Sequence, residues 1–103
     1  MTTTPLEWGP SAPNAMSWDE AKAWCEELGE GWRMPTLAEL FSAFDHEAGK
    51  PIGEGWVPFN YWSATTHARS SGFAWLVGFF NGSATTVGKV FPFRVRAVRG
   101  GES

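Results

Sequence analysis

Apolar residues recur every three or four positions in two stretches of the first half of the chain. This spacing predicts amphipathic helices. The first helix is expected to run from Ser17 to about Leu28, where Gly29 and Gly31 favour its end. Ser17 and Glu20 have the spacing of a capping box, in which each side chain binds the other residue's free backbone amide. The inner stripe of this helix is predicted to consist of Ala21, Trp24, Cys25 and Leu28.

The second helical stretch follows directly on a short apolar segment, residues 31–34, which predicts a buried strand. Pro35 marks the join, because proline has no amide hydrogen for a ladder and does not fit inside a helix. Thr36 and Glu39 have the spacing of a second capping box. The apolar stripe behind this cap is predicted to consist of Leu37, Leu40, Phe41 and Phe44.

The remaining segments predict loops and strands. Prolines make residues 1–16 an irregular N-terminal arm, anchored by Leu6 and Trp8. Glycines and prolines predict a long loop over residues 45–58, and polar residues predict another over 65–72. Asn81-Gly82 predicts a tight hairpin turn, because both residues tolerate a positive φ. Strands are expected at 61–64, 73–79, 84–90 and 92–99, and the second of these is apolar on both faces and hence central.

Two helices followed by a run of strands favour an α+β fold with a small twisted antiparallel sheet. A chain of 103 residues is expected to form a single domain, residues 1–103. Aromatic residues make up 16% of the chain, which favours a core built from large rings.

The charge pattern argues against several classes of protein. A net charge of −3 disfavours binding to a nucleic-acid backbone, which needs a basic stripe. Arg94, Arg96 and Arg99 gather near the end, and their spacing suggests one solvated strand face. No apolar run is long enough to cross a bilayer, and the first residues lack the features of a secretory signal. We therefore expect a cytoplasmic or virion-associated protein.

Residues that carry catalysis or bind metals are few. Cys25 lies on the predicted inner stripe, which favours a buried thiol over a reactive one. His46 and His67 have no partners at the spacing of zinc ligands, so no metal or other cofactor is expected. Asn81-Gly82-Ser83 matches a glycosylation acceptor, although a hairpin turn explains the same residues. No set of residues suggests an acid–base pair or a nucleophile, and we expect no enzymatic activity.

Four segments in this order resemble a known family. They are Met16-Ser17-Trp18-Asp19-Glu20-Ala21, Gly31-Trp32-Arg33-Met34-Pro35-Thr36, Tyr61-Trp62-Ser63-Ala64-Thr65 and Val95-Arg96-Ala97-Val98-Arg99-Gly100. The series resembles the DUF1566 family, the Legionella-collagen-like C-terminal type of domain, from about residue 8 to residue 100.

The resemblance implies a C-type-lectin-like fold related to formylglycine-generating-enzyme-like domains, with the chain ends close together. It also implies a bacterial or phage display scaffold that binds sugars, polyanions or proteins through its long loops. Many relatives carry a second cysteine where this chain has Ala97, which could bridge to the cysteine of the first helix. The enzymes of this fold use late cysteines, and none follows Cys25 here. The tripeptides that bind calcium in sugar-binding lectins are also absent, so binding is expected to be calcium-independent.

Aromatic residues outside the matching segments are the best candidates for binding, because exposed rings and arginines dominate binding hot spots. The predicted ligand-binding residues are Trp56, Phe59, His67, Arg69, Phe80 and Asn81. The leading hypothesis is a non-catalytic module that binds a protein through its loop face. A phage- or prophage-encoded protein that acts on a host protein is one form of it. The alternative is carbohydrate or polyanion binding at a bacterial or phage surface, through Arg69 and the row of Arg94, Arg96 and Arg99. The residues leave the oligomeric state open.

Overall fold

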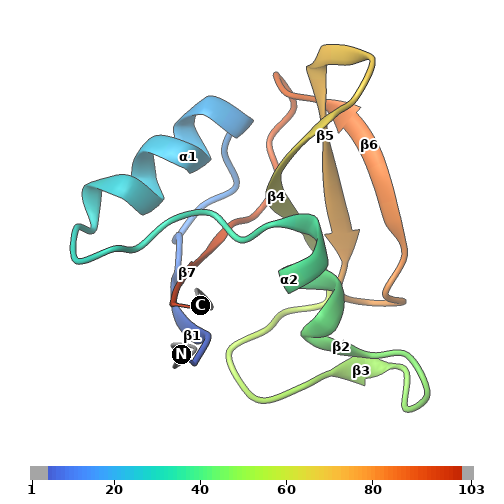
Figure 1. The fold of residues 1–103 in the computed structure, drawn as a ribbon. Coiled ribbons are helices and arrows are strands. Elements are labelled where there is room, and N and C mark those ends of the chain that lie inside the picture. Colours follow the sequence, from blue (N-terminus) through green and yellow to red (C-terminus); the bar gives the residue numbers. More distant parts are fainter. Residues whose placement is uncertain (1–4, 101–103) are drawn as a thin grey trace, which may run out of the picture.

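A computed structural model describes residues 5–100 of the chain (Figure 1). Two helices and seven strands follow one another within this range. They are β1 (Glu7–Ser11), α1 (Trp18–Glu27), α2 (Leu37–Ser42), β2 (Phe44–Asp45), β3 (Lys50–Pro51), β4 (Asn60–His67), β5 (Ser70–Gly78), β6 (Ala84–Gly88) and β7 (Arg96–Arg99). The predicted α+β class is confirmed, with all three small sheets antiparallel.

Both predicted capping boxes are present. The Glu20 carboxylate accepts from the backbone N of Ser17 at 3.1 Å, and the Glu39 carboxylate accepts from the backbone N of Thr36 at 2.8 Å. In return, the Ser17 and Thr36 hydroxyls accept from the backbone amides of these glutamates. The caps therefore fix the start of each helix, as the sequence predicted.

The predicted apolar stripes of the two helices extend too far at their C-terminal ends. Helix α2 is only six residues long, so Phe44 belongs to β2, where it is buried. Phe41 remains on the helix and is 43% exposed, and Leu28 at the end of α1 is 37% exposed. Each of these residues lies near the last turn of its helix, where the chain begins to leave the core.

The predicted irregular arm, residues 1–16, contains a strand in its described part. Strand β1 pairs with β7 in antiparallel fashion, with Trp8 opposite Val98. A second correction concerns residues 31–34, which form no strand. Arg33 makes only an isolated bridge to Val98, with both backbone hydrogen bonds at 2.9 Å. Val98 thus pairs with Trp8 on one side and Arg33 on the other, so both edges of the last strand are occupied at this residue.

The main sheet has the order β4-β5-β6, which confirms the central position of β5. The polar loop predicted at 65–72 is mostly strand, and only Ala68 and Arg69 form the turn. Pairing continues to His67 and Ser70 across two shifts of register. The threonines at 65 and 66 suit a strand. Thr66 pairs with Ala74, whereas the backbone N of Thr65 donates to the Ser63 hydroxyl at 3.2 Å. The predicted loop at 45–58 also contains a small hairpin, in which β2 pairs with β3.

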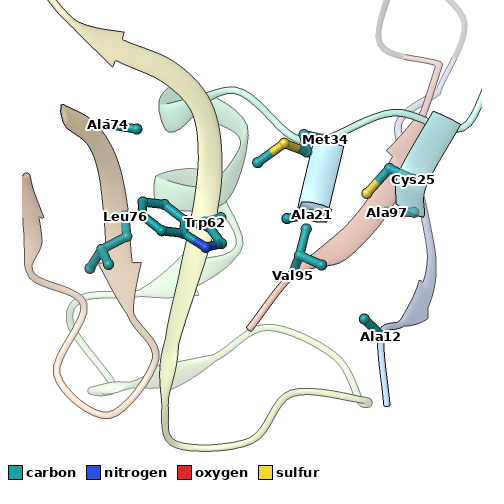
Figure 2. Close-up of a cluster of buried hydrophobic side chains, with 9 residues drawn as sticks. All are labelled: Ala12, Ala21, Cys25, Met34, Trp62, Ala74, Leu76, Val95 and Ala97. Atoms are coloured by element: carbon teal, nitrogen blue, oxygen red, sulfur yellow. The ribbon is translucent and has the colours of Figure 1, made fainter. Parts of the chain in front are cut away.

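The core consists of two clusters of buried side chains. Figure 2 shows the first, in which Trp62 of β4 lies between Leu76 of β5 and the residues of α1 and β7. The second joins α2 to the sheet through Leu40, Tyr61, Val77 and Phe79. Trp62 and Cys25 are fully buried, as their predicted core role requires. Val98 is also fully buried, between β1 and the segment before α2.

Candidate functional site

The six residues predicted to bind a ligand lie at two ends of the main sheet. Phe59 and Phe80 lie beyond the end where Asn60 pairs with Gly78, whereas His67 and Arg69 lie at the turn between β4 and β5. An eight-residue strand separates the two ends, a distance of about 25 Å. Phe59 and Phe80 therefore belong to one surface, and His67 and Arg69 belong to another.

Trp56 is packed into the second core cluster. Its ring stacks on Phe79 with the centroids 4.2 Å apart and an angle of 13° between the planes. The rings of Trp8 and Tyr61 are in T-shaped contact with it, with centroid distances of 4.9 and 5.0 Å. The Arg96 guanidinium lies 4.5 Å from the centroid of the Trp56 ring. Trp56 is half-buried in this arrangement and closes the core from the loop side.

Two exposed phenyl rings mark the first surface. Phe59 is 52% exposed and Phe80 is 57% exposed. The Phe80 ring covers the Cα of Gly78, so closely that a Cβ there would lie 2.8 Å from the ring. The guanidinium of Arg94 lies 5.0 Å from the centroid of Phe59. A shallow pocket of about 310 Å³ between these groups is lined by Ala15, Phe59, Asn60, Pro92, Phe93 and Arg94. We call Phe59, Asn60, Phe80 and Arg94 the Phe59 surface.

Asn81 supports the turn next to the Phe59 surface. Its side-chain oxygen accepts from the backbone N of Ser83 at 3.0 Å, and Gly82 adopts a φ of 77°. The predicted reversal is confirmed, but Asn81 itself has no positive φ. The connection runs from Phe79 to Ser83, so the turn is wider than a two-residue hairpin.

His67 defines the second surface. Its Nδ1 accepts from the backbone N of Arg69 at 3.1 Å, which places the hydrogen of the neutral ring on Nε2. The His67 ring stacks on the Trp75 ring, with their centroids 6.3 Å apart. Trp75 is half-buried and belongs to neither of the two core clusters. A pocket of about 270 Å³ is lined by His67, Ser70, Phe73 and Thr86, and Phe73 is 46% exposed. We call these four residues and Trp75 the His67 surface.

The row of arginines is not the solvated face that the sequence suggested. Each guanidinium lies over an aromatic ring, with Arg96 over Trp56 and Arg99 over Trp32. Arg96 also donates to the carbonyl oxygens of Gly9 at 2.8 Å and Glu54 at 3.0 Å, and burial lowers its pKa. Arg99 pairs with the carboxylates of Glu7 and Glu30. The spacing of the arginines alone could not reveal these partners, which come from distant segments.

Charge is divided unevenly along the chain. From Gly55 to Gly100 the sequence contains no Asp or Glu, whereas Lys and Arg occur at 69, 89, 94, 96 and 99. This segment contains the whole main sheet and β7. The strands that carry both candidate surfaces therefore contain basic residues and no acidic ones.

Within the described part of the chain, Cys25 is buried in the core and His46 contacts two phenyl rings. Within residues 5–100, no three His, Cys, Asp or Glu side chains lie close enough to hold a metal ion. Burial, together with the nearby charge of Glu26, raises the pKa of the Cys25 thiol to about 12. His46 contributes to packing instead, because its Nε2 lies 3.0 Å from the Gly82 carbonyl oxygen and its ring lies on Phe41. None of the helices described in the structure has the length and apolar character needed to cross a membrane.

The family model described as the Lcl C-terminal domain matches residues 2–99, nearly the whole chain. No curated protein matches the sequence.

Proposed function

Because this chain belongs to the Lcl C-terminal domain family, we propose that it is a non-catalytic binding module that recognises a protein through the Phe59 surface. The two helices and the antiparallel sheets serve as a rigid, lectin-like scaffold in this proposal. The loops before β4 and after β5 then present the contact residues.

The exposure of Phe59, which lies beside Arg94, and of Phe80, which lies over Gly78, carries this proposal. Each ring leaves about half of its surface in water, in a fold that buries Trp62 and Phe79 almost completely. Aromatic rings and arginines are enriched in protein–protein hot spots, because they bury much area and lose few rotatable bonds. The pocket beside Phe59 is shallow, which suits an inserted side chain better than an enclosed small molecule.

The burial and the raised pKa of the Cys25 thiol support a non-catalytic role. Nucleophilic attack by Cys25 would need a thiolate, and a pKa raised to about 12 suppresses that form at neutral pH. A buried, unpaired thiol also fits a reducing compartment such as the cytoplasm, or a virion assembled there. We propose that one form of this role is a phage or prophage product that acts on a host protein in that compartment.

Carbohydrate or polyanion binding remains the alternative proposal. An aromatic ring next to a cation, as in Phe59 and Arg94, can also contact a sugar acid. The row that this alternative relied on gives it less support, because Arg99 already pairs with two carboxylates and Arg96 with two carbonyl oxygens. A glycan array read with and without chelator separates the two proposals.

The direct test is to identify a bound protein by affinity capture and then to measure binding of the purified pair by calorimetry. Phe59→Ala and Phe80→Ala are each expected to weaken binding at least about tenfold. Phe73→Ala is the matched control, because Phe73 is a similarly exposed ring on β5, toward the other end of the main sheet. Equal binding by all three variants contradicts the proposed surface, and specific glycan binding without a protein partner favours the alternative.

A further inference from the structure

The two edges of the main sheet differ in how they are covered. The outer side of β4 is occupied, because the backbone N of Trp62 donates to the Arg94 carbonyl oxygen at 2.8 Å and that of Ala64 donates to the Pro35 carbonyl oxygen at 2.7 Å. Strand β6 is the last strand on the other side, and β5 is its one strand neighbour within the described residues. Figure 1 shows β6 at the outer margin of the fold, with no helix or strand beyond it.

The register of β6 shows which backbone groups face outward. The backbone N of Lys89 donates to the Gly72 carbonyl oxygen, and that of Gly78 donates to the Ser83 carbonyl oxygen, both at 2.9 Å. Hydrogen-bonded pairs alternate along an antiparallel ladder, so Thr85 and Val87 bind β5 and the residues between them face away. The Gly88 carbonyl oxygen already accepts from Phe91. Ala84 and Thr86 therefore present an amide and a carbonyl each at the open edge.

This edge lacks the features by which proteins usually prevent unwanted strand pairing. Natural edge strands carry charges, prolines or bulges. Strand β6 has the sequence Ala-Thr-Thr-Val-Gly, without a charge or a proline. Its pairing with β5 is continuous over five residue pairs, whereas the pairing of β4 with β5 shifts twice. An unprotected, regular edge is suited to receive another strand.

The surroundings of the edge indicate the chemistry of the added strand. Thr86 lines the pocket of the His67 surface together with Phe73, so apolar side chains of an added strand would find a ring next to them. Lys89 follows β6 directly, with its Nζ 3.9 Å from the centroid of the Trp18 ring, and Arg69 is exposed at the neighbouring turn. The whole segment from Gly55 to Gly100 lacks carboxylates. An extended segment with acidic side chains complements this charge.

We propose that the open edge of β6 is a strand-addition site for an extended, acidic segment of a partner protein. The segment pairs with the backbone of Ala84 and Thr86, in the manner of proteins that bind peptides by extending a sheet. Alternate side chains of the segment face Phe73, and carboxylates lie near Lys89 and Arg69. This site is separate from the Phe59 surface and does not depend on it.

The test uses the full chain and a capped peptide of about six alternating valine and glutamate residues, the usual length of a strand. Binding is followed by amide chemical shifts in NMR spectra, and the largest shifts are expected at Ala84, Thr86 and Gly88. Raising the salt concentration is expected to weaken binding, because exposed charges are screened. A peptide of valine and lysine is expected to bind at least about tenfold more weakly.

Two variants at Thr86 distinguish the contribution of its backbone amide to peptide binding from that of its side chain. Thr86→Pro removes the outward amide without touching the ladder to β5, and it is expected to weaken peptide binding about tenfold or more. Thr86→Ala keeps the amide and is expected to change binding less than about twofold. If Thr86→Pro does not fold, Ala84→Pro serves in its place, because the first residue of a strand tolerates proline.

Four outcomes overturn the proposal. Unchanged binding by a folded Thr86→Pro variant excludes pairing through this edge. Equal binding of the two peptides excludes the charge preference, and absence of binding at millimolar peptide excludes the site. A dimer that sedimentation detects and that Thr86→Pro abolishes assigns the edge to a second copy of this chain. Phe59→Ala is expected to leave peptide binding unchanged. The strand-addition site and the Phe59 surface can therefore be contradicted independently of each other.

Discussion

Arg33 and Glu39 form a two-pronged ion pair, with Nη1 2.8 Å from Oε1 and Nη2 2.8 Å from Oε2. The same Glu39 carboxylate caps α2 through the backbone N of Thr36. Arg33 also donates to the Gly100 carbonyl oxygen at 2.9 Å, just after β7. One ion pair therefore connects the link between the helices, the start of α2 and the end of the described chain.

Glu39→Gln is expected to lower the free energy of unfolding by about 1 to 3 kcal/mol, because it weakens the cap and leaves Arg33 without its carboxylate. Chemical denaturation at neutral pH measures the change. Glu47→Gln is the control, since the Glu47 side chain is exposed on the β2–β3 turn, and it is expected to have almost no effect. Equal stability of both variants would show that the ion pair contributes little.

The contribution of Glu39 is expected to depend on pH. The hydrogen bonds from Arg33 hold the pKa of Glu39 below its usual 4.5, more than its burial raises it. A carboxyl group whose pKa is lower in the folded state stabilises the fold above its unfolded pKa, and this contribution is lost as the pH falls through the folded value. The stability difference between the parent protein and Glu39→Gln should therefore be constant above about pH 5 and shrink below about pH 4.5. Denaturation curves over pH 3 to 7 test this, and a difference that grows in acid would contradict it.

Cys25 is expected to resist alkylation in the folded protein. At pH 8 a thiol with a pKa of about 12 is ionised only to about one part in ten thousand, and its side chain is buried. Mass spectrometry after iodoacetamide treatment should show modification only once denaturant is added. Cys25→Ala should keep partner binding, so loss of binding by a folded variant would contradict a purely structural thiol.

Trp56 and Phe80 are expected to behave differently although the sequence placed both in one binding set. Trp56→Ala removes a ring that stacks on Phe79 and is expected to cost about 3 kcal/mol of stability. Phe80→Ala removes an exposed ring and is expected to cost less than about 1 kcal/mol. Thermal unfolding of the two variants compares them directly. A larger loss for Phe80 would place that ring in the core instead of on a binding surface.

Gly82→Ala is expected to destabilise the protein by about 2 kcal/mol or more. Gly82 has a φ of 77°, and a Cβ there would lie 2.5 Å from the Phe44 ring. Both strain and overpacking follow from the substitution. Gly72→Ala is the control, because Gly72 has no positive φ and open space around its Cα. Similar stability of the two variants, measured by denaturant titration, would contradict the close packing of the turn.

The candidate surfaces show how far single residue types can predict a site. Phe59 and Phe80 are exposed, as their place outside the family's matching segments suggested, but Trp56 looked the same in the sequence and is packed. The difference comes from Phe79 and Arg96, which lie far along the chain and enclose Trp56 from two sides. The spacing of residues along the chain predicts which face of a helix or strand a side chain is on. It does not predict which side chains from other segments pack against that face.

The sequence by itself determined the local features of this protein. Both capping boxes and the Asn81-Gly82 turn depend on residues within three positions of one another, and the central strand depends on one continuous apolar run. Only the tertiary structure decided that β1 pairs with β7, that Val98 is covered on both sides and that β6 is left with an open edge. Those outcomes depend on which distant strands meet, and the free energy of that choice comes from packing and backbone pairing shared by the whole fold.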